Sequence, residues 1–198
     1  MTNDRAISSD RAMRLEPASL RARLVFALFR WVVYGTVMCV GELFFYNLIR
    51  LGRALPVVQM LFQFDWQVDP ALPLNGIWAT PPHMLYGQCS LWMFPEYAFA
   101  LLLMIEPLSR WMHGRCILLR AMVYGVAILL YEGLTGLLLK GMLGYAVWYY
   151  GDAYAILEGS TTLLILPVCC LVGLYNEMVT REVNHPAVYA YVLNRFTT

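Results

Sequence analysis

Residues 120–140 read RAMVYGVAILLYEGLTGLLLK, a stretch that is apolar almost throughout. Its basic ends, Arg120 and Lys140, lie 20 positions apart. Along a helix this separation is roughly 30 Å, the thickness of the hydrocarbon core of a bilayer. The stretch therefore predicts a membrane-spanning helix with a basic residue at each face. One carboxylate, Glu132, lies well inside it, and an acidic group at that depth is costly enough to require an explanation.

The composition of the whole chain is that of a membrane protein. The 198 residues are 60% hydrophobic and only 14% charged, whereas soluble proteins carry roughly 25% charged residues. Four apolar runs occupy most of the length, so we predict an all-α membrane protein with a single four-helix domain over residues 24–180. Polar tails cover residues 1–23 and 181–198. The predicted spans are about 24–51, 88–108, 116–141 and 160–179.

The chain repeats itself. Six residues of the first run recur 90 positions later in the third run, which gives both the pattern R-x-x-V-Y-G-x6-E-x7-[R/K]. The second and fourth runs share G-x-x-[S/T]-L-x-x-[F/L]-P at a spacing of 72 positions. Each predicted helix-loop-helix unit crosses the membrane twice, so the two repeats are parallel rather than inverted. The matched residues of the first and third runs are Arg30, Val33, Tyr34, Gly35, Glu42 and Arg50 with Arg120, Val123, Tyr124, Gly125, Glu132 and Lys140.

The distribution of arginine predicts the orientation. Most arginines outside the runs lie in the two tails and in the link 109–115, which places both termini on the cytoplasmic side. The proline-rich loop 52–86, with short helices of which 57–64 is amphipathic, and the loop 142–158 then face the lumen or the exterior. Trp148, Tyr149 and Tyr150 suit the headgroup level there. An endomembrane or the plasma membrane is the expected location, and the mitochondrial inner membrane is the alternative.

Counting residues from the arginines predicts a polar layer near the middle of the bilayer. Glu42 and Glu132 follow Arg30 and Arg120 by 12 residues, or roughly 18 Å of helix. Glu96 and the thiols of the fourth run lie at similar depths, counted from Arg110 and Arg181. Thr135 lies about one turn from Glu132. The predicted layer comprises Glu42, Glu96, Glu132, Thr135, Cys169 and Cys170, and the predicted membrane-face residues are Arg30, Arg50, Arg120 and Lys140.

Three functions fit such a layer. The glutamates are protonated and structural in the first, which makes the protein a non-catalytic component of a membrane assembly. They form a path for protons or ions in the second, a small carrier. In the third, a lipid-modifying enzyme, three carboxylates and Cys169 bind a metal such as zinc, although the layer contains no histidine. We expect the lipid bilayer and other membrane-protein subunits as partners, and no nucleic acid, cofactor or bound metal.

Several short motifs resemble the transmembrane protein 229 family, whose bacterial relatives are labelled ABC transporter type IV proteins. The stretches YEGLTGLLL (131–139), VWYY (147–150) and LEGSTTL (157–163) are similar to its E-x-x-T-G, W-D-Y and fourth-helix glycine elements. On this resemblance Gly136, Trp148, Tyr150 and Gly159 are family-motif positions. Tyr149 stands where the family has an aspartate.

The resemblance covers about residues 28–180 and implies a small four-helix membrane protein. The sequence contains no G-x-x-x-x-G-K-[S/T] phosphate loop, no G-x-G-x-x-G and no H-E-x-x-H motif, and these are the recurrent nucleotide and zinc-protease signatures. The chain is therefore not an ATPase of those designs, and an energised transporter of this family type would need a partner subunit.

Overall fold

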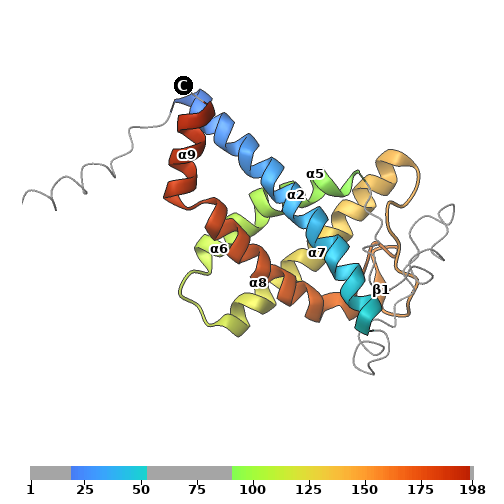
Figure 1. Ribbon diagram of the computed structural model, residues 1–198. Helices are drawn as coiled ribbons and strands as arrows, with labels where there is room; N and C mark the ends of the chain where they lie inside the picture. Colours follow the sequence, from blue (N-terminus) through green and yellow to red (C-terminus); the bar gives the residue numbers. More distant parts are fainter. Residues whose placement is uncertain (1–18, 53–90, 197–198) are drawn as a thin grey trace, which may run out of the picture.

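The computed structural model describes residues 19–52 and 91–196, except for the side chains of residues 46–52. The described chain is mostly helical (Figure 1). The predicted loop from residue 53 onward and the first 18 residues of the predicted tail lie outside the described residues. The elements are α2 (Leu20–Gly52), α5 (Met93–Phe99), the π-helix η1 (Ala100–Ile105), α6 (Glu106–Trp111), α7 (Ile117–Leu143), β1 (Ala155–Ile156), β2 (Thr161–Thr162), the 3-10 turn η2 (Leu163–Ile165), α8 (Leu166–Val183) and α9 (Pro186–Phe196).

Helix α2 begins four residues before the predicted span. Ser19 caps it, because the Ser19 hydroxyl oxygen accepts the backbone N–H of Ala22 at 3.2 Å and so satisfies one of the free donors of the first turn. The polar tail predicted over residues 1–23 therefore stops at the cap, and residues 20–23 belong to the helix.

The second predicted span is not one regular helix. It starts at Met93 rather than residue 88, and it passes from α5 through the π-helix η1 into α6, ending at Trp111. A π-helix holds an extra residue within its turn compared with an α-helix. The irregular segment Ala100–Ile105 is apolar and gives no sign in the residue pattern that its hydrogen bonding differs.

Helix α7 agrees closely with the predicted third span. It ends where Gly144, with φ 78°, donates its N–H to the carbonyl oxygen of Lys140 at 3.0 Å, a left-handed glycine cap. The fourth span differs more, because residues 161–162 pair as a strand with Ala155 and Ile156, and α8 starts only at Leu166. The all-α expectation is thus wrong for this small antiparallel hairpin.

Glycines let the helices approach closely in two pairs, α2 with α5 and α7 with α8. A Cβ added to Gly35 would lie 2.8 Å from the Phe94 ring. Gly173 of α8 faces the Cβ of Tyr124 in the same way. Small residues at helix contacts are the usual means of tight packing inside a membrane, and Tyr124 is completely buried.

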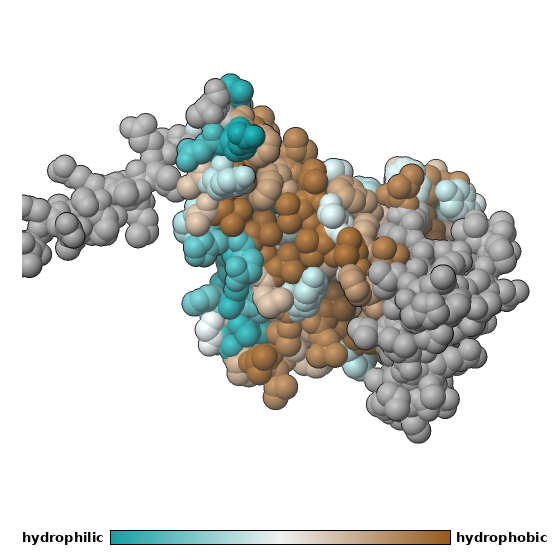
Figure 2. All heavy atoms as spheres, viewed as in Figure 1, coloured by the Kyte–Doolittle hydropathy of each residue, from teal (hydrophilic) through white to brown (hydrophobic). Residues whose placement is uncertain are grey.

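Three described helical segments are long and apolar enough to cross a membrane, namely Leu20–Phe45, Ile117–Leu143 and Leu163–Val183. Their outer faces carry exposed large apolar side chains, as lipid contact requires. Figure 2 shows hydrophobic surface across the middle of the molecule and hydrophilic residues along the edge where α9 and the end of α8 lie. On α7 the exposed apolar residues recur every four positions: Leu118, Met122, Val126, Leu130, Leu134 and Leu138.

The segment expected as a C-terminal tail is largely structured. Helix α8 continues to Val183, and α9 folds back against the start of α2 (Figure 1). The Tyr189 ring meets Phe26 edge-on with centroids 4.7 Å apart, and Val192 is fully buried. The apolar periodicity of residues 186–196 therefore serves packing against the first helix.

Candidate functional site

Glu132 is held by the segment that follows its own helix. The Tyr150 hydroxyl donates to one carboxylate oxygen at 2.7 Å, and the Thr161 hydroxyl donates to the other at 2.8 Å. Both oxygens of the predicted intramembrane acid therefore have partners within the chain. These partners come from the connection between α7 and α8, which returns along α7 rather than remaining beyond its end.

This returning segment packs on the glycines of α7. A Cβ on Gly136 would lie 2.7 Å from the Ser160 Cβ and 3.1 Å from the Trp148 ring, and a Cβ on Gly133 would meet the Leu157 side chain. The Trp148 indole N–H donates to the Ser160 carbonyl oxygen at 2.7 Å. Of the three aromatic residues predicted for the headgroup belt, Trp148 and Tyr150 are buried against α7 and do not face the surroundings, whereas Tyr149 is 40% exposed.

The hairpin turn has an unusual backbone. Leu157, Glu158 and Gly159 all have positive φ, at 52°, 56° and 78°, and each of the two non-glycine residues costs about 1–2 kcal/mol in that region. Gly159 has no room for a side chain, because an added Cβ would meet the Tyr149 ring and lie 2.9 Å from the Tyr150 carbonyl oxygen. Surrounding contacts must hold such a turn in place.

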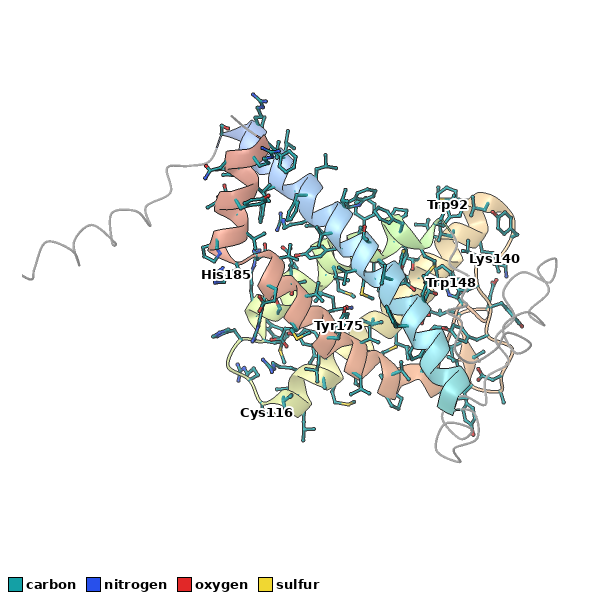
Figure 3. The ribbon with its side chains drawn as sticks, in the orientation of Figure 1. Trp92, Cys116, Lys140, Trp148, Tyr175 and His185 are labelled. Carbon is teal, nitrogen blue, oxygen red and sulfur yellow. The ribbon has the colours of Figure 1, made fainter. Side chains whose placement is uncertain are left out.

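The side chains of two acids, Glu158 in the turn and Asp152 before it, make further contacts that support the turn. Lys140 donates to the Glu158 carboxylate at 2.8 Å, and this hydrogen bond, with the charge of Lys140, lowers the pKa of Glu158. One Asp152 carboxylate oxygen accepts both the Tyr154 backbone N–H and the Thr162 hydroxyl at 2.8 Å. Figure 3 shows Lys140 and Trp148 at the same end of the molecule, away from Cys116 and His185.

Glu96 meets α7 on a different face. It is 9% exposed, and one of its carboxylate oxygens lies 3.3 Å from the Thr135 hydroxyl oxygen. Its other carboxylate oxygen is buried and has no hydrogen-bond partner among the described residues. The Tyr131 hydroxyl donates to the Glu96 backbone carbonyl at 3.1 Å. Glu42 and Glu132 are both within electrostatic reach of its carboxylate.

The predicted layer is thus partly assembled. Thr135 is 15 residues from Arg120 and five from Lys140, or about 22 Å and 8 Å of helix, so it lies nearer to Lys140 than to Arg120. Cys169 is buried within reach of Glu132. Cys170 instead faces Gly125 and lies 4.0 Å from the Met122 sulfur.

Two buried glutamates that the sequence reasoning did not single out hold the opposite end together. Glu106 accepts from Arg30 at 2.7 Å, from Arg110 at 3.3 Å and from Asn184 at 2.9 Å, and it also accepts from Tyr34. We call these five residues the first clamp. Arg30, predicted to mark a membrane face, is therefore an ion-pair partner inside the protein, with a side chain only 18% exposed.

The second clamp has the same design on α7 and α8. Glu177 accepts from Arg120 at 2.9 Å and also pairs with Arg181, and Tyr124 lies beside it. Both clamp glutamates are 3% exposed. The sequence signal for them was an E-x-x-x-R pattern repeated 71 positions apart, at 106–110 and 177–181.

Two predicted membrane-face residues, Arg50 and Lys140, belong to neither clamp. The side chain of Arg50 lies outside the described residues. Lys140 is 42% exposed and pairs with Glu158, as a residue at a membrane face can.

Comparison of the chain with protein-family models, curated proteins and solved structures finds no match.

Proposed function

We propose that this protein is a four-span integral membrane protein that acts as a non-catalytic structural or accessory subunit of a membrane assembly. The observation that carries the proposal is that the two clamp glutamates and Glu132 are satisfied within the chain by side chains from neighbouring elements. Charges used in this way fix helices relative to one another and leave little capacity for transported ions. Their partners span the sequence from Arg30 to Asn184.

The proposed fourth span is the run from Met93 to Trp111. Its 19 residues correspond to about 28 Å of helix, which is close to the hydrocarbon thickness. Two of its three acidic or basic residues, Glu106 and Arg110, lie in the first clamp, so they do not count against a span as unpaired charges would, and the third, Glu96, is buried against α7. Burial against α2 further supports placement within the bundle.

The clamps support the proposed parallel repeat. Arg30 and Tyr34 recur at Arg120 and Tyr124, and each pair meets an E-x-x-x-R acid on the next long helix. Arg30 lies in the N-terminal half of α2 and Arg120 in the first turn of α7, and the acids of both clamps lie toward the end of the helices that follow, so the halves share one orientation in this proposal. With the arginines of the clamps facing the cytoplasm, both termini are cytoplasmic in an endomembrane or the plasma membrane.

Membership of the transmembrane protein 229 family remains part of this proposal. It is supported by the roles of the motif residues: Gly136 admits the hairpin, Trp148 and Tyr150 bind within it, and Gly159 makes its turn. The lipid-modifying enzyme has less support, because no group of three metal-ligating side chains within residues 19–45 and 91–196 is placed to hold a metal ion.

Purification of the full chain from native membranes, followed by identification of co-purifying proteins, tests the subunit role. We expect stoichiometric membrane-protein partners that persist in Glu132→Gln, because glutamine retains an oxygen for one of the two hydroxyl donors. The proposal fails if the chain purifies alone and catalyses transport in liposomes that a folded Glu132→Gln variant no longer catalyses.

A further inference from the structure

The two proposed repeats differ at one buried position. Glu96 follows Pro95, and in the other half Val168 follows Pro167. The acid therefore has no role in the clamp design that both halves share. It lies instead among side chains from three other helices: Glu42 of α2, Tyr131, Glu132 and Thr135 of α7, and Cys169 of α8 beyond Glu132.

The backbone of the two halves also differs shortly after this position. Pro95 and Glu106 are 11 positions apart, whereas Pro167 and Glu177 are 10 apart. The π-helix Ala100–Ile105 lies within the longer interval, and a π-turn arises from a single extra residue and is frequent at functional sites. The extra residue thus lets Glu106 keep its place in the first clamp, although the segment between Glu96 and Glu106 contains a π-turn that begins four residues after Glu96.

The hydrogen bonding around Glu96 indicates where a proton resides. The Thr135 hydroxyl has a single hydrogen, and its oxygen lies 2.8 Å from the Tyr131 carbonyl oxygen but 3.3 Å from the Glu96 carboxylate. If the hydrogen goes to the closer acceptor, a hydrogen bond between Thr135 and Glu96 requires the proton to come from Glu96. No basic side chain among the described residues lies beside this carboxyl group.

From these observations we propose that Glu96 is a proton-binding site, which takes up and releases a proton toward the aqueous phase on the Lys140 side. That side is the nearer one, because Thr135, which contacts Glu96, lies five residues from Lys140. The access proposed for the carboxyl group is movement of the π-turn, which begins four residues after Glu96. The comparison of the halves rests on the repeat proposed above, whereas the burial and contacts of Glu96 do not.

Labelling of the full-length protein in liposomes with dicyclohexylcarbodiimide, a hydrophobic reagent that reacts with protonated carboxyl groups, tests this inference. Peptide mass spectrometry locates the label in the wild-type chain without any substitution. We expect the label on Glu96, with yield falling about tenfold for each pH unit above its titration point. We expect little label on Glu132, whose two oxygens accept from Tyr150 and Thr161.

Variants sharpen the test. Glu96→Gln should lose the label, and the matched Glu132→Gln should keep it. Deletion of Leu103, a lipid-facing residue of the π-turn that is 66% exposed, restores the ten-residue interval of the other half and should reduce labelling of Glu96 while the first clamp survives. Absence of label at Glu96 at every pH, equal label on Glu132, or a yield independent of pH would overturn the proposal. None of these outcomes bears on whether the chain co-purifies with partners.

Discussion

Replacing Glu106 by glutamine tests the clamps most directly. The change keeps the size of the side chain and removes its charge, so Arg30, with a side chain only 18% exposed, is left without a counter-charge. Removing one partner of a buried ion pair costs about 3–5 kcal/mol. The second partner, Arg110, is 72% exposed, and an exposed pair four residues apart on a helix adds only about 0.3–0.5 kcal/mol.

We therefore expect Glu106→Gln to lower the free energy of unfolding by about 3 kcal/mol, the lower end of the buried range because Arg30 retains some solvent contact. Unfolding of the purified protein in mixed micelles with increasing dodecyl sulfate measures this. Glu177→Gln, the equivalent change in the second clamp, should have a similar effect. Glu158→Gln is the matched control, because it removes a carboxylate from the exposed pair with Lys140, and it should have little effect.

A double-mutant cycle separates the ion pair from other effects of the substitution. Arg30→Gln combined with Glu106→Gln should be less destabilising than the sum of the two single changes, with a coupling of about 0.5–3 kcal/mol. The reasoning is refuted if Glu106→Gln unfolds like Glu158→Gln, or if the two changes in the first clamp are simply additive.

Three further predictions concern the hairpin. Gly159→Ala should destabilise by about 1–3 kcal/mol more than Gly144→Ala, because the left-handed strain is common to both and only the side chain at Gly159 would also clash; equal melting temperatures would contradict this. Tyr150→Phe should lower the free energy of unfolding by about 1.5–3 kcal/mol, because it removes a donor to a buried carboxylate, and a shift within error would exclude that bond. Lys140 lowers the pKa of Glu158. The ion pair therefore stabilises the fold at pH values above the ordinary pKa of glutamate, and this stabilisation is lost as the pH falls through the lowered pKa. The difference in thermal stability between wild type and Glu158→Gln should therefore vanish on acidification, and its persistence in acid would contradict the assignment.

The apolar runs predicted the long helices well, because residue type alone decides which segments avoid water. The third span, 116–141, corresponds to α7 within two residues at its end. The repeat also identified Arg30 and Arg120 as equivalent. It did not identify their acids, since one extra residue shifts Glu106 out of the 72-position register that relates Pro95 to Pro167. A π-turn absorbs this shift, and its apolar residues look the same in either helix type.

The hairpin could not be predicted for a different reason. The residues LEGSTT (157–162) lead into the predicted fourth span, which begins at Ser160, and their local preferences favour the beginning of a helix. Tertiary contacts outweigh these preferences. Glu132 accepts a hydrogen bond from the Thr161 hydroxyl, and Ser160 and Trp148 pack against Gly136, where a side chain would leave no room. Tertiary contacts also explain why Trp148 is buried although tryptophan beside a membrane span usually marks the interface.

The docking of α9 on α2 has a consequence for synthesis of the protein. Tyr189, which covers Phe26 of α2, is translated 163 residues after it, so this part of α2 leaves the ribosome well before its partner. A product truncated before α9 would therefore expose the apolar side of α2 that α9 covers. Quality-control factors can recognise such exposed apolar surface.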